Sequence, residues 1–162
     1  MGKPFVGSNP TPCIMKFKVY YTKRIDLEAI EKALWENFHV AIEDAGFLAL
    51  PENAFNKVRQ QYNAILLLPH IPPYSIWIVD KDIYVDKMNF VFGIAWQRKA
   101  IVSTYRLPDE IIPKEVVHEV GHLFGLEHCK NYCVMQFSNS LMEVMAKPSK
   151  LCNGCKRKLK LQ

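Results

Sequence analysis

The chain has 162 residues, 49% of them hydrophobic, and a formal net charge of +5 at pH 7. A chain of this size buries one hydrophobic core, which excludes a second independent domain. Its longest apolar run, residues 64–68, is too short to cross a bilayer, and no secretory leader is recognisable. We therefore expect a cytoplasmic protein with reduced thiols and no membrane partner.

The first elements predicted are a strand and a helix. Residues 1–14 are rich in Gly, Pro, Ser and Asn and show no hydrophobic period, so a flexible extension is expected there. Beyond Met15, apolar and polar side chains alternate as in a half-buried strand, with apolar positions at Phe17, Val19 and Tyr21. Asp26 can cap a helix that ends before Val40, with apolar positions at Leu27, Ile30, Leu34 and Phe38.

A second strand is predicted within residues 40–50, on one side or the other of a break at Asp44-Ala45-Gly46. Residues 55–68 have a pattern compatible with a second helix, in which Gln60 and Gln61 lie on the polar side. A proline cluster ends this helix, because proline cannot continue it: Pro69, Pro72 and Pro73.

Three further strands are predicted ahead of the last long helix. Residues 76–85 form a buried strand interrupted at Asp80-Lys81-Asp82. We interpret these aspartates as solvated or capping turn groups with no role in chemistry. Residues 89–96 and 100–105 are strands joined by a hairpin-sized connection at residues 97–99.

The stretch with the most chemical information begins at His118 and reads His-Glu-Val-Gly-His-Leu-Phe-Gly-Leu-Glu-His. On a helix, His118 and His122 lie about 40° apart around the axis and about 6 Å apart along it, so one metal ion can contact both imidazoles. Glu119 lies about 60° beyond His122 around the axis. This position flanks the metal face without entering it, which suits a carboxylate that takes a proton from a metal-bound water.

A third ligand has to come from outside the helix. Gly125 permits a left-handed exit of the chain, after which His128 can return to the ion. Three neutral imidazoles leave the fourth position of a tetrahedral zinc open to water, which is the arrangement of a catalytic site. The ion lowers the pKa of that water towards neutrality, and Glu119 can accept its proton.

The alternative is an amphipathic helix in which histidines repeat by chance. It is disfavoured because three of the chain's five histidines fall within residues 118–128. The other two, His39 and His70, are expected to be ordinary surface or core residues. The opposite face of the helix is apolar and is expected to pack on the sheet, through Val116, Val117, Val120, Leu123 and Phe124.

Four of the five cysteines follow this motif, at Cys129, Cys133, Cys152 and Cys155. Their spacing, with a final C-x-x-C pair, is typical of the ligands of a closed structural zinc site. Two disulfides or simple core cysteines are the alternatives, and the expected reducing compartment argues against disulfides. Because the segment after Gly125 is too short for a core of its own, a second zinc ion would supply the missing stability.

Together these motifs resemble the archaemetzincin family of zinc metallopeptidases: H-E-x-x-H-x-x-G-x-x-H-C, then C-x-M at Cys133-Val134-Met135, then C-x-x-C. More loosely, residues 82–85, 89–93 and 102–107 resemble the family's strands ahead of the helix. One departure is the first cysteine pair, which the family's pattern separates by four residues and this chain by three, Lys130-Asn131-Tyr132. The shape of that loop is therefore expected to differ.

The resemblance implies a role for each motif residue. A catalytic zinc ion would be bound by His118, His122 and His128, with Glu119 as the base. A structural zinc ion would be bound by Cys129, Cys133, Cys152 and Cys155. Met135 would lie beneath the catalytic zinc.

The expected fold is α/β, of the α+β type: a small twisted mixed sheet with packed helices, as in metzincins, with the zinc helix at its base. Residues 15–162 are expected to form one metallopeptidase domain. Its N-terminal subdomain spans residues 15–125, and a short zinc-stapled C-terminal subdomain spans residues 126–162. The cleft lies between the two.

The expected function is hydrolysis of a peptide or protein substrate by a monomer with one catalytic and one structural zinc ion. An extended substrate would bind the strand at residues 89–96, as a candidate sheet edge beside the zinc helix, through main-chain hydrogen bonds. Besides zinc itself, Tyr132 is a candidate for stabilising the oxyanion.

The competing hypothesis is a non-catalytic zinc protein that binds a nucleic acid or protein partner through its cysteine site and basic tail. A purely structural site would have no need for Glu119. Nucleic acid is disfavoured because the tail is short and has no interleaved aromatic residues for stacking. The negative charge of a tetrathiolate zinc offers another reason for these cations, namely Lys147, Lys150, Lys156, Arg157, Lys158 and Lys160.

Overall fold

The structure, a computed structural model, describes residues 14–160, and the predicted extension at residues 1–14 therefore lies almost wholly outside the described part. The strands are β1 (Lys16–Tyr21), β2 (Ala41–Phe47), β3 (Phe55–Asn56), β4 (Gln61–Asn63), β5 (Ser75–Val79), β6 (Ile83–Tyr84), β7 (Gly93–Trp96) and β8 (Lys99–Ser103). The α-helices are α1 (Leu27–Phe38), α2 (Ala64–Leu67), α3 (Ile112–Leu123), α4 (Leu141–Ala146) and α5 (Asn153–Lys160). Short 3-10 helices span Glu52–Ala54, Leu68–His70 and Asp109–Ile111.

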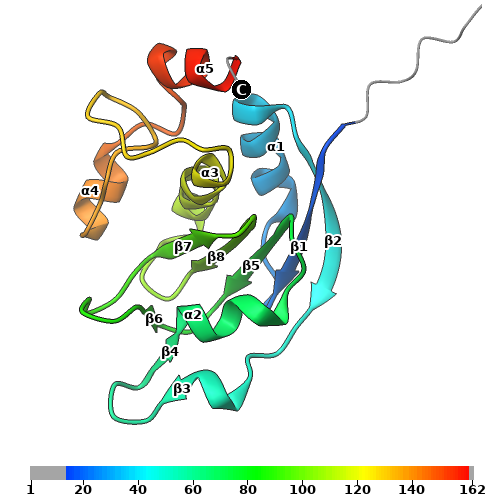
Figure 1. Cartoon of the computed structure of the whole chain (residues 1–162), viewed down its shortest axis with the longest axis vertical. Helices are drawn as coiled ribbons and strands as arrows, with labels where there is room; N and C mark the ends of the chain where they lie inside the picture. The colour runs from blue at the N-terminus through cyan, green and yellow to red at the C-terminus, as the bar shows by residue number, and fades with distance from the viewer. Residues whose placement is uncertain (1–13, 161–162) are drawn as a thin grey trace, which may run out of the picture.

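The main sheet has five strands in the order β2-β1-β5-β8-β7 (Figure 1). Four of them are parallel, and β7 is antiparallel to β8 at one edge. A second sheet contains the short strands β3, β4 and β6 and is drawn below the main sheet in Figure 1. The prediction of a mixed α/β fold is confirmed.

The central strands have an apolar core on each side, because successive side chains of a strand point to opposite faces. In β5, Ile76 and Ile78 belong to the core shared with α1 and α3. Trp77 and Val79 belong to the core shared with α2 and β6. Residues 76–79 therefore form the continuous apolar run that is typical of a strand buried on both faces.

The predictions for the first strand and helix are confirmed. Phe17 and Val19 of β1 are buried, and α1 spans the predicted residues. The side chain of Asp26 accepts a hydrogen bond from the N–H of Ala29 at 3.0 Å, which caps the first turn of α1. The helix ends at His39, which adopts a left-handed conformation with φ of 55°.

The predicted break in the second strand is wrong. β2 runs through Asp44-Ala45-Gly46, and its pairing with β1 shifts register between Val19 and Tyr20. Gly46 has φ of +89°, and its N–H donates to Asp44 Oδ1 at 2.9 Å. The turn-forming residues therefore mark a β-bulge in an edge strand and not the end of a strand.

The helix predicted at residues 55–68 is also wrong, since only α2 at its end is helical. The side chain of Asn56 accepts hydrogen bonds from the N–H groups of Val58 and Arg59, both at 3.1 Å. Gln60 follows in a left-handed conformation with φ of 57°. This local bonding favours the β3–β4 turn over a helix, because an Asn side chain competes with helical backbone bonding.

A polar cluster, buried at Gln61 and Asp82, joins the second sheet to residues 85–95, which form one rim of a cleft. Gln61 donates to Asp82 Oδ2 at 2.9 Å and to the carbonyl of Asn89 at 2.8 Å. Arg106 donates two hydrogen bonds to Asp82, at 2.9 and 2.8 Å, and lies 3.9 Å from the ring centre of Phe90. The interpretation of Asp82 as a solvated or capping group is therefore wrong, because it anchors Arg106 and Gln61.

Residues 126–160 form no hydrophobic core of their own. Leu126, Val134, Met135, Val144 and Leu151 are buried in the same cluster as the side chains of β1 and α3. The division into subdomains at residue 125 stays a prediction. None of the helices within residues 14–160 has the length and hydropathy needed to cross a membrane.

We predict that Asp82→Asn lowers the free energy of unfolding at pH 7 by about 1 to 3 kcal/mol, because Arg106 loses its charged partner. Although burial opposes it, hydrogen bonds from Arg106 and Gln61 hold the pKa of Asp82 below its ordinary value. A lowered folded-state pKa stabilises the protein above the unfolded value of about 3.9, and this contribution is lost as the pH falls through the folded-state pKa.

Urea unfolding at pH 7 and at a more acidic pH measures this effect. Asp86→Asn on the same exposed rim is the control and should change stability little. The prediction is contradicted if the difference in unfolding free energy between Asp82→Asn and the native protein stays constant as the pH falls through the folded-state pKa of Asp82.

Candidate active site

Helix α3 and the turn that follows it bring three histidines together. Gly125 has φ of +86°, as predicted, and the N–H of Leu126 bonds back to the carbonyl of Gly121 at 3.0 Å. This turn returns His128 to the helix, where its ring centre lies 4.8 Å from that of His122 and 5.4 Å from that of His118. One ring nitrogen from each histidine lies within 4.8 Å of the others.

Hydrogen bonds orient two of the imidazoles. His118 Nδ1 lies 2.8 Å from the Val134 carbonyl, and His122 Nδ1 lies 2.8 Å from the Leu126 carbonyl. A carbonyl can only accept, so each Nδ1 carries the proton and each Nε2 presents a lone pair. The two Nε2 atoms are 3.2 Å apart. A tetrahedral zinc ion with Zn–N bonds of about 2.0–2.1 Å requires about 3.3 Å between ligand nitrogens, so the donor set fits.

The environment keeps these imidazoles neutral, which is the form that binds a metal. Burial, aided by the positive charge of Lys147, lowers the pKa of His118 to about 3. Burial also lowers the pKa of His122 and of His128. At neutral pH, a cation can therefore approach three uncharged donors.

Glu119 lies beside the histidines on the wall of a cleft of about 670 Å³. The cleft is lined by the rim at residues 85–95, by α3 and by residues 137–139. Burial, reinforced by the neighbouring carboxylate of Glu115, raises the pKa of Glu119 well above its ordinary value. A divalent cation held by the imidazoles would oppose this shift, because it favours the ionised carboxylate.

Gly93 of β7 lets the edge strand pass directly over Glu119. A Cβ atom at Gly93 would lie 2.9 Å from Glu119 Cγ and 2.8 Å from the Ile101 carbonyl oxygen. Any other side chain would therefore displace either the carboxylate or the strand.

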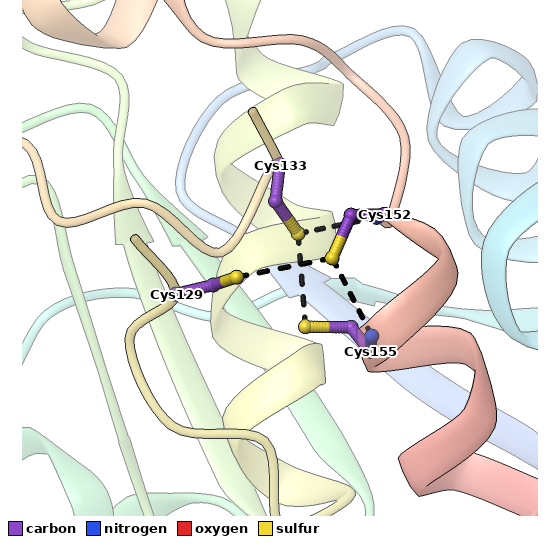
Figure 2. A group of neighbouring side chains, drawn as sticks. All are labelled: Cys129, Cys133, Cys152 and Cys155. Carbon is purple, nitrogen blue, oxygen red and sulfur yellow. Dashed lines mark hydrogen bonds between the residues drawn. The ribbon is translucent and has the colours of Figure 1, made fainter. Parts of the chain in front are cut away.

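The four cysteines form a second cluster, and Figure 2 shows their sulfur atoms facing one another. The Sγ atoms of Cys129 and Cys152 are 3.8 Å apart, as are those of Cys133 and Cys155. A tetrahedral zinc with Zn–S bonds of about 2.3 Å requires about 3.8 Å. All four cysteines are free, so the disulfide alternative is wrong for them.

Backbone donors favour the thiolate of Cys152, whereas burial raises the pKa of Cys133 and of Cys155. The N–H of Cys155 donates to Cys152 Sγ at 3.4 Å, and the N–H of Cys152 donates to Cys133 Sγ at 3.3 Å. Although burial opposes it, hydrogen bonds from the Cys155 backbone and from neighbouring thiols lower the pKa of Cys152 to about 6. A thiolate is the form that binds zinc.

The loop at residues 133–135 joins the two clusters. Cys133 belongs to the cysteine cluster, and Val134 accepts the hydrogen bond from His118. Met135 packs under α3 at Gly121, where a Cβ atom would overlap with Met135 Sδ. The position of Met135 thus depends on a glycine of the H-E-x-x-H motif.

Two charged residues of the site were not predicted. Glu115 lies one turn before Glu119 on α3, and helical spacing could have indicated it. Lys147 comes from the end of α4 and is 2% exposed. Its ammonium contacts the carboxylate of Glu115 at 3.8 Å, so its ion pair is with α3, and the expectation that it balances the cysteine cluster stays a prediction.

Other candidates lie away from the cleft. Tyr132 is 72% exposed and is not among the lining residues, so the structure gives it no contact with a substrate carbonyl there. His39 caps α1, and His70 is exposed, as expected for ordinary residues. Asp80 accepts a hydrogen bond from Thr22 at 2.8 Å, as expected for a turn group.

The sequence model of Peptidase family M54 matches residues 18–161. The chain belongs to this family. Curated relatives are named archaemetzincin, and that of Nanoarchaeum equitans is 45% identical over 143 residues, covering 79% of this chain and 84% of the relative. The archaemetzincin of Archaeoglobus fulgidus is 42% identical over 117 residues, covering 65% of this chain and 73% of the relative.

Solved archaemetzincin structures have the same fold. The Methanopyrus kandleri structure superposes with a TM-score of 0.85 at 35% identity, covering 94% of this chain and 97% of that chain. The Archaeoglobus fulgidus structure, complexed with malonate, superposes with a TM-score of 0.83 at 34% identity, covering 89% and 99%. The resemblance inferred from the motifs is confirmed, and the protein is a zinc metallopeptidase.

Proposed function

We propose that the protein cleaves peptide bonds in the cleft under β7, with Glu119 as general base and a catalytic zinc held by His118, His122 and His128. The observation that carries this proposal is the convergence of three neutral imidazoles beside the buried carboxylate of Glu119. A closed structural site would need a fourth protein ligand and would have no use for that carboxylate.

Zinc bound there would polarise the scissile carbonyl and lower the pKa of the attacking water. In our proposal, a carboxylate oxygen of Glu119 accepts the proton of that water and then passes it to the departing amine. Val134 and Leu126 keep the Nε2 atoms of His118 and His122 aimed at the metal position throughout. The Gly93 backbone limits the space into which the Glu119 side chain can move.

The substrate is proposed to be an extended peptide that pairs with β7. β7 is an edge of the main sheet. It is shorter than the strand predicted at residues 89–96, because Val91 bonds to Ile83 of the second sheet instead. The N–H of Ser103 donates to the Phe92 carbonyl at 2.8 Å. By the alternation of an antiparallel ladder, the main-chain groups of Ala95 then point outward and can bond a substrate.

The edge proposal predicts that Ala95→Pro weakens peptide binding, because it removes an outward N–H while sparing the pairing with β8. Ala95→Val keeps that N–H and is the matched control. Peptide affinity, measured by calorimetry at constant zinc content, should fall about 10-fold in Ala95→Pro. This change corresponds to the loss of one hydrogen bond that contributes about 1 kcal/mol or more to binding. Equal affinities in the two variants would place the substrate elsewhere.

The general-base proposal predicts that Glu119→Gln reduces kcat by about 10²-fold to 10⁴-fold, because an amide cannot accept the proton. Zinc content and melting temperature should not change. Glu127→Gln, at an exposed position beside His128, is the control and should leave kcat unchanged. If Glu119→Gln cleaves a peptide library as fast as the native protein, another base is at work.

We further propose a second, structural zinc ion at the four cysteines, which would connect residues 126–160 to the rest of a monomeric single-domain peptidase. The observations that support it are the sulfur spacing and the hydrogen bond from the Cys155 N–H that favours the Cys152 thiolate. Such sites contribute folding energy directly, on the order of 10 kcal/mol in small zinc-finger peptides.

Cys152→Ser should reduce bound zinc from two ions to about one and lower the melting temperature sharply, since the second site stabilises the fold. Elemental analysis and thermal unfolding measure both effects. Cys13→Ser, which removes the fifth cysteine, is expected to keep both ions. One zinc ion in the native protein, or an unchanged melting temperature in Cys152→Ser, would rule out the structural site.

A further inference from the structure

A lysine is buried beneath the catalytic helix. The Lys147 side chain is 1% exposed, and its Nζ lies 3.8 Å from a Glu115 carboxylate oxygen and 3.2 Å from the Gln136 carbonyl oxygen. Nζ is also 3.2 Å from His118 Nδ1, but that nitrogen carries a proton for Val134, so the ammonium is its neighbour and not its hydrogen-bond partner. Burying a lysine this completely is costly unless an opposite charge accompanies it.

The backbone of Lys147 is tied to the same helix. Lys114 of α3 donates to the carbonyls of Val144 and Lys147, at 3.0 and 2.7 Å. These carbonyls belong to the end of α4, where a cation is favourable. Contacts with α3 therefore fix the position of the Lys147 backbone as well as the surroundings of its ammonium group.

Glu115 is the link between Lys147 and the proposed base. It is 4% exposed, and one of its oxygens, one oxygen of Glu119 and a ring nitrogen of His118 lie within 4.8 Å of one another. Glu115 Oε2 has no hydrogen-bond partner, and Lys147 is the one ion-pair partner of Glu115 within residues 14–160. Two buried carboxylates this close repel each other unless a cation balances them.

We propose that Lys147 is a positioning residue for the proposed general base: by pairing with Glu115, it prevents Glu115 from repelling Glu119 and so keeps the Glu119 carboxylate beside the histidines. This inference rests on the proposed role of Glu119. The Gly93 backbone closes the side of Glu119 under β7, so a carboxylate repelled by Glu115 has the cleft as its remaining space. There, it would no longer be aligned with the reacting water.

This proposal differs from two simpler roles of the lysine. If Lys147 only stabilised the end of α4, its loss would lower the melting temperature but leave catalysis per folded, zinc-loaded molecule unchanged. If its ammonium contacted the substrate directly, its loss would raise KM, and removal of Glu115 could not correct the defect. Only the positioning role predicts that the effect of Lys147 depends on the charge of Glu115.

The test is a double-mutant cycle with Lys147→Met, Glu115→Gln and the combined variant, all compared at full zinc occupancy. Lys147→Met should lower kcat by about 10-fold to 100-fold, the usual effect of removing a residue that supports a metal site, with KM within about 2-fold. The combined variant should recover to within about 5-fold of the native kcat, because the unbalanced carboxylate is gone. Lys150→Met, at an exposed lysine of the same segment, is the matched control.

A second readout does not require turnover. Acetohydroxamate chelates a metal through two oxygens and presents an acidic N–O–H proton to a neighbouring carboxylate, so its affinity reports where Glu119 lies. Titration of the cobalt-substituted protein, followed by its visible spectrum, should show about 10-fold weaker binding in Lys147→Met and recovery in the combined variant. The ligand-free spectrum should be the same in all variants if the three imidazoles are unmoved.

The outcomes separate the proposals. A Lys147→Met protein with native kcat and hydroxamate affinity, or a combined variant as impaired as Lys147→Met, overturns the positioning role. If Lys147→Met does not fold, the combined variant is the test. The positioning role requires it to fold and to approach the native kcat and hydroxamate affinity, and failure to do either overturns the proposal. If the native protein cleaves no peptide while the hydroxamate affinities follow the predicted pattern, the proposed function fails and the positioning of Glu119 stands.

Discussion

The contact between α3 and the loop at residues 133–135 is the constraint on which the rest of the site depends. Met135 can lie under the helix only because residue 121 is glycine, and this close approach brings the Val134 carbonyl within hydrogen-bonding distance of His118. The same approach brings Cys133 to the other cysteines. One packing contact thereby sets the orientation of an imidazole and the position of a thiol, so the two clusters share a single structural support.

The charges around α3 are arranged so that each buried group has a specific neighbour. The imidazoles are neutral, the carboxylates of Glu115 and Glu119 lie side by side, and Lys147 is the buried cation that faces them. The cations of α5, in contrast, are exposed. The lysines and arginines of the C-terminal part therefore serve different purposes, which composition alone does not distinguish.

The opposite wall of the cleft depends on the second sheet. Ile83 of β6 belongs to the second apolar core, but the rim beside it is held by polar contacts of Gln61, Asp82 and Arg106. Arg59 adds hydrogen bonds to the carbonyls of Met88 and Asn89. A rim held by directional hydrogen bonds and stacking keeps its shape beside an open cleft, where close apolar packing is available on one side only.

The sequence by itself determined the elements whose cause is local. Side-chain spacing and backbone sterics predicted the helical period and Asp26 cap of α1, the alternation in β1 and the left-handed turn at Gly125. The structure has each of these features where it was predicted. The spacing of the histidines and cysteines likewise predicted two clusters, because ligand geometry restricts which residues can meet. Membership of the archaemetzincin family was recognisable for the same reason.

Only the tertiary structure decided the rest. Residues 55–68 have the apolar pattern of a helix, yet Asn56 bonding and the pairing of β4 with β6 outweigh that weak preference. Asp44-Ala45-Gly46 looks like a turn until its pairing with β1 is known. Lys147 has no local signal at all, since it is 29 residues from His118 in sequence and reaches α3 only through the packing of α4. Contacts between distant segments depend on which surfaces pack together, and spacing along one element carries no information about them.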